Sequence, residues 1–361
     1  MTIKAHPSIY KITPYVGGDI TPEGMSRRIV LASNENPYGC SPQVSDTLKA
    51  HIHHIHSYPS GGAASLKQAI ANHFLLDPQQ ILCGNGSEDI LHLVARCFAG
   101  PGDEVISPHY GFQVYRIAAM SVGATLVYAP QPNYISEIEA ILSSITPRTK
   151  IIYLDNPANP LGTYLDKGKL RRLIEQTPPH IIIVLDAAYA DYLEEADDYT
   201  SGFELVEKHP NLIITRTFSK LYGLASLRLG WCYSSVDVIH LLNRIRPPFN
   251  VNKLAQIAGI AAIGDQEWAK NVRQKMVQIK ENFIKFLHEK SYRFLPSGGN
   301  FVSVEFPEAG PHNAKETYQH LGKNGILVRP VLPYGLPNHL RITIGTADEM
   351  VELCDALEAR I

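Results

Sequence analysis

The fold is decided by two stretches of the chain, IIIVLD at 181–186 and NLIITRTFSKLYGLASLRLG at 211–230. Each begins with a run of apolar, mostly β-branched residues that does not alternate with polar ones. Such a run is typical of a strand buried on both faces of a parallel sheet. A residue able to do chemistry follows each run, Asp186 in the first stretch and Lys220 in the second. Because ligands bind beyond the carboxyl ends of parallel strands, both residues are predicted to lie at one ligand site.

The same alternation of strand and helix extends through the middle of the chain. Further strand-like runs are ILCG (81–84), EVIS (104–107), TLVYA (125–129) and KIIYLDN (150–156). This spacing predicts βαβ crossovers and an α/β fold, with helices on both faces of a mostly parallel sheet. A more antiparallel α+β pattern follows in FVSVEF (301–306), ILVRP (326–330) and LRITIG (340–345). We therefore predict an N-terminal arm over 1–27, a large domain over 50–265, and a smaller domain made of 28–49 with 266–361.

The composition argues against several classes of protein. The 361 residues are 45% apolar and carry a net charge of -2, so neither disorder nor electrostatic capture of nucleic acid or anionic membrane is expected. No apolar run approaches the length of about 18 residues that spans a membrane. The first residues lack a signal-peptide pattern. The five cysteines form no CxxC pair, which favours a reducing compartment. We expect a cytoplasmic protein.

The histidine count, 15, is the unusual number, and four of these residues lie in one short segment. They are His51, His53, His54 and His56. Histidines three residues apart lie on one face of a helix, so the pairs His51/His54 and His53/His56 could in principle share a metal ion. No nearby Cys, Asp or Glu completes a set of ligands, and imidazoles suit the last turn of a helix. The sequence therefore favours a helix end here, and we predict no metal site.

Polar side chains follow each predicted strand of the large domain, and each has an ordinary alternative explanation. Gly84-Asn85-Gly86-Ser87-Glu88-Asp89 could bind a phosphate at a helix N-terminus or form a simple turn. The segment 156–162, NPANPLG, could aim an amide into a cleft or be a proline-rich turn. Asp186 could cap a helix, and Lys220 could be a solvated surface lysine. At a buried strand end, however, Lys220 would lose solvation and become a usable amine nucleophile.

Taken together, these groups match the requirements of pyridoxal 5'-phosphate (PLP). That cofactor needs a lysine for its aldehyde, an acid for its pyridine nitrogen and a cradle for its phosphate. The segments TFSKLYGLASLRLG, SNENPYG (33–39) and NPANPLG give the sequence a clear resemblance to the fold-type I PLP-dependent aminotransferases, and most of all to the histidinol-phosphate aminotransferase family. The resemblance runs from Ser33 to Gly345 and so covers nearly the whole chain.

The resemblance implies a role for individual residues of the cofactor site. Lys220 would hold PLP and move a proton, Asp186 would pair with the pyridine nitrogen, and Tyr110 would stack on the ring. Tyr189 and Asn159 would bond the ring 3'-oxygen. The phosphate would be held by Gly86, Ser87, Glu88, Thr217, Ser219 and Arg228. Tyr58 would reach the phosphate of a neighbouring subunit's cofactor, which implies a homodimer with shared sites.

For the substrate, the resemblance implies that Arg341 binds an anionic end, with Arg329 as a second guanidinium and Asn159 beside them. Tyr15 would contact a substrate phosphate across the dimer. Planar bidentate donors suit phosphate and carboxylate oxygens. The sequence departs from the usual family pattern at Leu161, Ser226 and Ser60, but no catalytic group is lost.

The expected reaction is transamination between L-histidinol phosphate and 2-oxoglutarate in histidine biosynthesis. One alternative is an aromatic or broad-range amino-acid aminotransferase, which shares nearly every motif. A second alternative is a PLP decarboxylase of phosphorylated threonine. A PLP-binding transcription regulator would need a further DNA-binding module, and the net charge of -2 argues against one.

Overall fold

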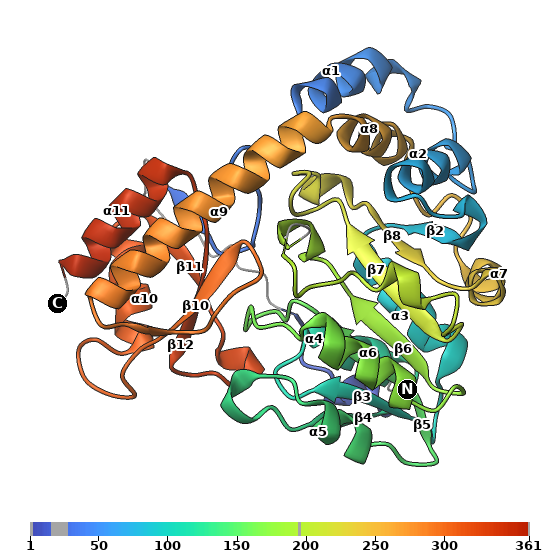
Figure 1. Cartoon of the computed structure of the whole chain (residues 1–361), viewed down its shortest axis with the longest axis horizontal. Helices are drawn as coiled ribbons and strands as arrows, with labels where there is room; N and C mark the ends of the chain where they lie inside the picture. Colours follow the sequence, from blue (N-terminus) through green and yellow to red (C-terminus); the bar gives the residue numbers. More distant parts are fainter. Residues whose placement is uncertain (1–2, 16–27, 194–195, 360–361) are drawn as a thin grey trace.

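The computed structural model describes residues 3–15, 28–193 and 196–359, and Figure 1 shows the whole chain as two sheets flanked by helices. The larger sheet has seven strands in the order β2-β8-β7-β6-β5-β3-β4. Their bounds are β2 Ile81–Gly84, β8 Gly230–Tyr233, β7 Leu212–Thr217, β6 Ile182–Asp186, β5 Thr149–Asp155, β3 Glu104–Pro108 and β4 Thr125–Ala129. Only β8 is antiparallel to its neighbours, so the predicted α/β fold with a mostly parallel sheet is confirmed.

The second sheet lies in the C-terminal part of the chain. It has five strands in the order β1-β11-β12-β10-β9. Their bounds are β1 Ile29–Leu31, β11 Ile326–Pro330, β12 His339–Thr343, β10 Phe301–Glu305 and β9 Arg293–Phe294. Pairing is antiparallel except between β1 and β11, as the α+β pattern predicts.

Eleven α-helices surround the two sheets in the described residues. They are α1 Pro42–His51, α2 Ala64–Phe74, α3 Ser87–Phe98, α4 Gln113–Ser121, α5 Ile138–Ser143, α6 Lys167–Gln176, α7 Val236–Ile245, α8 Lys253–Gly264, α9 Gln266–Glu289, α10 Ala314–Lys323 and α11 Ala347–Glu358. Polar side chains begin many of them: Ser41, Asp166, Asn252 and Thr346, for example, each accept a hydrogen bond from a backbone N–H in the first turn. Such caps satisfy donors that the helix itself cannot.

The central strands are apolar throughout because the large sheet is buried on both faces. Along β5, Ile152 and Leu154 belong to one hydrophobic cluster, whereas Ile151 and Tyr153 belong to another. Residues of α3, α4 and α7 complete the second cluster, and residues of α2, α5, α6 and α8 pack in the first. These strands show no alternation of apolar and polar residues because both faces of the sheet are buried, as the sequence predicts.

The predicted small-domain segment 28–49 is divided in the structure. Its first part, β1, pairs in register with β11 of the small sheet. Its second part belongs to α1, which packs on α8 beside the large sheet. The sequence analysis does not predict strand β8, because GWCY begins with glycine and contains no β-branched residue. Within the predicted arm, a single 3-10 turn lies at Ile9–Lys11, and residues 16–27 lie outside the described residues.

Candidate functional site

A cavity lies between the carboxyl ends of β5, β6 and β7 and the facing strands of the small sheet. It gathers most of the residues that the sequence singles out. These are Tyr15, Ser87, Glu88, Asn159, Asp186, Tyr189, Thr217, Ser219, Lys220, Arg228, Arg329 and Arg341. Parallel strands bring their carboxyl ends to one edge of a sheet, which is why residues far apart in the sequence meet here.

Lys220 lies in the wall of this cavity, in the turn after β7. Its Nζ donates a hydrogen bond to the Ser33 carbonyl at 3.1 Å. Loss of solvation, and then the positive charge of Arg341, lower the pKa of Lys220 to about 7. A large fraction of this amine is therefore unprotonated at neutral pH, as attack on a carbonyl carbon requires.

Asp186 ends β6 and is 5% exposed. The hydroxyls of Thr215 and Tyr115 donate hydrogen bonds to its two oxygens, each at 3.0 Å. Burial raises the pKa of Asp186, while these donors, and then Lys220, act in the opposite direction. A buried carboxylate held in this way is suited to pair with a protonated ring nitrogen.

Tyr189 stands close to both of these groups. Its hydroxyl oxygen accepts a hydrogen bond from Asn34 Nδ2 at 2.8 Å. Burial raises the pKa of Tyr189 to about 12, so the phenol keeps its proton at neutral pH. Its own O–H can then donate to an anionic oxygen placed in the cavity.

The predicted phosphate cradle is built where the turn before α3 meets the loop after β7. Gly86 has φ +87°, a backbone conformation that favours glycine, and a Cβ at this position would stand 2.7 Å from Arg228 Nη2, so that the guanidinium would have to move. Ser87 begins α3, whose N-terminal N–H groups favour an anion. Thr217, at the end of β7, and Ser219 just after it add hydroxyls to the lining of the cavity. The residues present therefore fit a phosphorylated ligand.

The two arginines come from neighbouring strands of the small sheet and stand in register, Arg329 on β11 opposite Arg341 on β12. Arg341 donates from Nη1 to Asn159 Oδ1 at 2.5 Å and from Nη2 to the Ala32 carbonyl at 2.6 Å. Burial lowers the pKa of Arg341. Both recorded partners are neutral, so the charge of this guanidinium remains to be matched by an anion.

Tyr15 lies near this arginine pair and lines the cavity of its own chain. Its ring is 5.7 Å from Arg329 Cζ. The arm carrying Tyr15 is held on α4, where Arg116 donates to the Lys11 carbonyl at 3.1 Å. The expected contact of Tyr15 with a substrate phosphate across a dimer stays a prediction.

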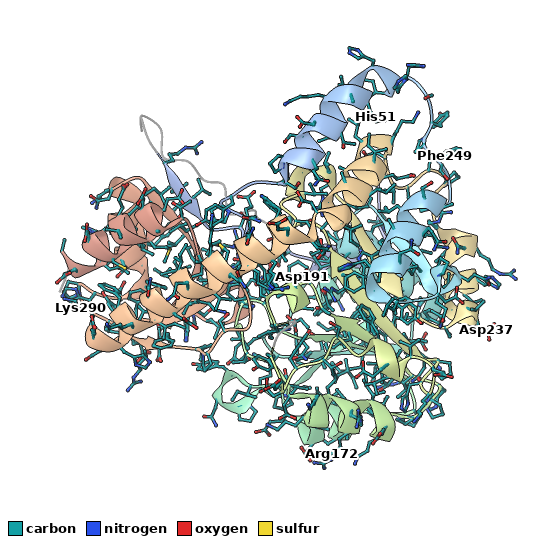
Figure 2. The ribbon with its side chains drawn as sticks, turned by 45° about the horizontal axis from the view of Figure 1, so that its top comes forward. His51, Arg172, Asp191, Asp237, Phe249 and Lys290 are labelled. Atoms are coloured by element: carbon teal, nitrogen blue, oxygen red, sulfur yellow. The ribbon has the colours of Figure 1, made fainter. Side chains whose placement is uncertain are left out.

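Three predicted cofactor residues are not among those that line the cavity: Gly86, which lies in the turn before α3, Tyr110 and Tyr58. Tyr110 packs against Tyr134, with ring centroids 5.5 Å apart, and Phe112 lines the cavity instead. Tyr58 is 80% exposed and stacks on Phe249 at 4.7 Å, on a face of the molecule that Figure 2 marks by Phe249. Their roles stay predictions.

The histidine segment lies at the end of α1, as expected, and continues as a 3-10 turn at Ile52–His54. Figure 2 places His51 at the far end of that helix. His51 Nδ1 lies 2.9 Å from the Thr47 carbonyl, and His56 Nδ1 lies 3.2 Å from the His53 carbonyl. In the described part of the chain, no group of three His, Cys, Asp or Glu residues is arranged to hold a metal ion. No described helix is long and apolar enough to cross a membrane.

Sequence reasoning missed four residues of the site. These are Asn34, Phe112, Tyr115 and Asp155. Asn34 belongs to SNENPYG, a motif already noted, and its contact with Tyr189 spans 155 positions of the sequence. Asp155 occupies the same strand-end position on β5 that Asp186 occupies on β6. That equivalence is visible in the two runs KIIYLD and IIIVLD, and it could have drawn attention to Asp155.

Comparison with known proteins gives the class and then the family. The sequence model for aminotransferase class I and II matches residues 26–357. The chain is 45% identical over 352 residues to the histidinol-phosphate aminotransferase of Rhodospirillum centenum, covering 98% of this chain and 97% of that one. It is 42% identical over 361 residues to the protein of that name from Maricaulis maris, covering 99% of this chain and 98% of that one.

A solved structure gives the same result. The histidinol-phosphate aminotransferase of Sinorhizobium meliloti, in complex with pyridoxal-5'-phosphate, superposes with a TM-score of 0.91 at 26% sequence identity. The match covers 100% of this chain and 98% of that one. The chain therefore belongs to the histidinol-phosphate aminotransferase family of class I and II aminotransferases.

Proposed function

We propose that this protein is a PLP-dependent enzyme of histidine biosynthesis that transfers an amino group between L-histidinol phosphate and 2-oxoglutarate, so that glutamate is the amino donor when histidinol phosphate is formed. The observation that carries the proposal is the pair Arg329 and Arg341, standing in register across the cavity from Lys220 and Asp186. The part of the cavity around Lys220 suits attack of an amine on a carbonyl carbon, and the part around the two arginines suits binding of an anion. The names of the relatives support the same substrate.

When bound, PLP supplies an electron sink for the bonds at the substrate's α-carbon. The residues of the chain do the rest. Lys220 would hold the cofactor's carbonyl carbon and carry a proton between carbon atoms, for which an amine of pKa about 7 is suited. Asp186 would keep the ring nitrogen protonated, and Tyr189 with Asn159 would bond the ring oxygen. Ser87, Thr217, Ser219 and Arg228 would hold the phosphate, with Gly86 allowing its close approach.

Both substrates of the proposed reaction carry an anionic group that the two arginines could bind. Glutamate and 2-oxoglutarate would present a carboxylate, and histidinol phosphate would present its phosphate ester. The two guanidiniums offer planar donor pairs to either group. Because Arg341 already bonds Asn159, its position is tied to the side chain proposed to touch the cofactor ring.

We further propose a cytoplasmic homodimer with shared active sites. The support is the apolar surface around Tyr58: Ile55 is 64% exposed and Phe249 is 43% exposed beside it. Large exposed apolar groups gathered on one face mark an interaction surface. Sedimentation should give a dimer, and Tyr58 should reach the partner's cofactor phosphate.

Steady-state assays of the holoenzyme with a panel of amino donors test the substrate. Histidinol phosphate should give the highest kcat/KM, with 2-oxoglutarate consumed in equal amount. Activity on phenylalanine or tyrosine with none on histidinol phosphate would favour the aromatic alternative. Release of CO₂ from phosphorylated threonine without consumption of 2-oxoglutarate would favour the decarboxylase alternative.

A further inference from the structure

A second buried carboxyl group, Asp155, faces the cavity beside Asp186. Asp155 ends β5, stands in register with Asp186 on β6 and is 4% exposed. In a parallel pair in register, the two side chains point to the same face of the sheet. The reaction described above uses only Asp186, so Asp155 has no assigned task.

The two carboxyl oxygens of Asp155 have different surroundings. Oδ2 accepts a hydrogen bond from the backbone N–H of Asn159 at 2.8 Å. Oδ1 is buried and has no hydrogen-bond partner among the described residues. Burial raises the pKa of Asp155 to about 7, and Asp186 adds to this rise, whereas the backbone N–H groups of Asn159, Phe112 and Asp155 itself oppose it. A buried oxygen without a partner is costly when charged, so a proton on this carboxyl relieves the cost.

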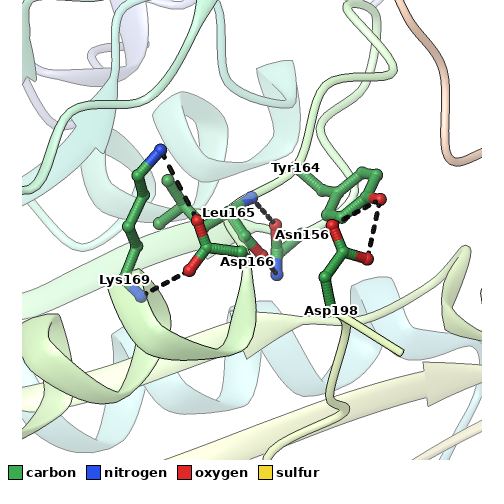
Figure 3. Close-up of polar contacts among 6 residues, drawn as sticks. All are labelled: Asn156, Tyr164, Leu165, Asp166, Lys169 and Asp198. Carbon is green, nitrogen blue, oxygen red and sulfur yellow. Dashed lines mark hydrogen bonds and ion pairs between the residues drawn. The ribbon is translucent and has the colours of Figure 1, made fainter. Parts of the chain in front are cut away.

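Asn159 links Asp155 to the anion-binding end of the cavity. Its backbone N–H bonds Asp155, and its side-chain Oδ1 accepts from Arg341 Nη1. The loop that carries Asn159 is closed at its base by Asn156, which accepts from the Leu165 N–H at 2.7 Å and donates to the Leu165 carbonyl at 3.3 Å (Figure 3). The hydrogen bonds of Asn156 with Leu165 and of Asp155 with the Asn159 N–H hold this loop in place. They therefore set the position at which the Asn159 side chain contacts Arg341.

We propose that Asp155 is a positioning residue that acts through Asn159 on Arg341, so that the end of β5 helps to set the affinity of the site for the substrate anion. The titratable groups that face Asp155 are Asp186 on β6, Tyr115 on α4 and Tyr189 after β6. None of them is a cation that would compensate a charge on Asp155. Ionisation of Asp155 therefore adds negative charge to a site that binds anions. The inference rests on the proposed role of Arg341 in anion binding.

The test uses inorganic sulfate, which stays a dianion at neutral pH, titrated calorimetrically into the holoenzyme. The variants are Asp155→Ala and Asp155→Asn, with Asp198→Asn as a control. Asp198 is an exposed carboxyl whose partner is the Tyr164 hydroxyl (Figure 3). At pH 6.5, Asp155→Ala should weaken sulfate binding about tenfold, the size of one lost hydrogen bond. Asp155→Asn keeps an acceptor for the Asn159 N–H, so this variant and the control should stay within about twofold of the unmodified protein.

The pH dependence separates positioning from simple loss of structure. Between pH 6 and pH 8.5, sulfate affinity of the unmodified protein should fall several-fold more than that of Asp155→Asn, which cannot ionise. Other titrating groups affect both proteins equally, so the difference belongs to Asp155. This comparison stands even if Asp155→Ala fails to fold. In steady-state assays, Asp155→Ala should raise KM for the anionic substrate more than it lowers kcat.

The result that overturns the inference is specific. Sulfate affinity of Asp155→Ala within twofold of the unmodified protein would show that Asp155 does not position Arg341. The same pH slope for Asp155→Asn and the unmodified protein would show that ionisation of Asp155 does not change the affinity of the site for anions. Arg341→Ala, measured alongside, must itself weaken sulfate binding. If it does not, the proposed anion site is wrong; if Arg341→Ala weakens binding but Asp155→Ala does not, only the role of Asp155 is wrong.

Discussion

The two sheets supply their functional side chains in different ways. In the large sheet, Asp186 and Lys220 lie at or beyond the ends of parallel strands, where hydroxyls and backbone groups from several segments surround them. In the small sheet, Arg329 and Arg341 lie within neighbouring strands and stand in register. The first arrangement can hold a group in a fixed orientation, and the second presents two guanidiniums side by side. The comparison suggests that one side of the cavity serves the cofactor and the other side serves the substrate.

Lys220→Ala should have the largest effect, on the cofactor side. Turnover should fall by roughly 10⁴-fold or more, and the visible absorbance of the bound cofactor should be lost, because no other lysine among the described residues lines the cavity. Absorbance spectroscopy and steady-state kinetics measure both. Lys285→Ala, at an exposed lysine of α9, is the matched control and should behave as the unmodified protein. Retained turnover in Lys220→Ala would contradict the whole assignment.

Arg341→Ala should have the next largest effect and should leave the cofactor absorbance unchanged. Loss of two charge-assisted hydrogen bonds to the substrate anion should lower kcat/KM roughly 100-fold, chiefly through KM. Arg172→Ala, at an exposed arginine of α6 that Figure 2 labels, is the control. An unchanged KM would place the substrate anion elsewhere in the cavity.

Arg329→Ala tests how the two arginines of the small sheet divide the binding of the substrate anion. We expect a loss of about tenfold in kcat/KM for histidinol phosphate, because the in-register Arg341 remains. The loss should be smaller for glutamate, whose carboxylate has fewer oxygens to bind than a phosphate ester has. Equal losses for both substrates would argue against a division of labour between the two arginines.

The last prediction concerns pH and the apoprotein. Lys220 has a pKa of about 7, so its unprotonated fraction rises up to that pH and then levels off. The rate at which the apoprotein captures the cofactor, followed by stopped-flow absorbance, should therefore rise about fivefold between pH 6 and pH 7, by about a further twofold above pH 7, and flatten above pH 8. A rate that continues to rise to pH 10 would indicate a solvated lysine with an ordinary pKa.

The sequence predicted the large sheet well because buried parallel strands are apolar on both faces and their ends carry the chemistry. Lys220, Asp186 and Tyr189 lie where that pattern places them. Local patterns did not predict the hydrogen bonds of Asn34 and Tyr115, since these side chains reach their partners only after β1 and α4 have packed against the large domain. Asp155 was missed because its importance depends on the register of β5 with β6, a relation that no single segment contains.

Helix α9 joins the large sheet's side of the molecule to the small sheet's side, as Figure 1 shows. Its 24 residues make a rod of about 36 Å. At its start, Asp265 accepts hydrogen bonds from the Trp268 N–H and from the hydroxyl of Ser41 at the start of α1. A rod of that length acts as a lever: a turn of about 5° at Asp265 moves its far end by about 3 Å. The far part of α9 packs on β9 and α11, so the clamp at Asp265 helps to set where the small sheet stands relative to the large one.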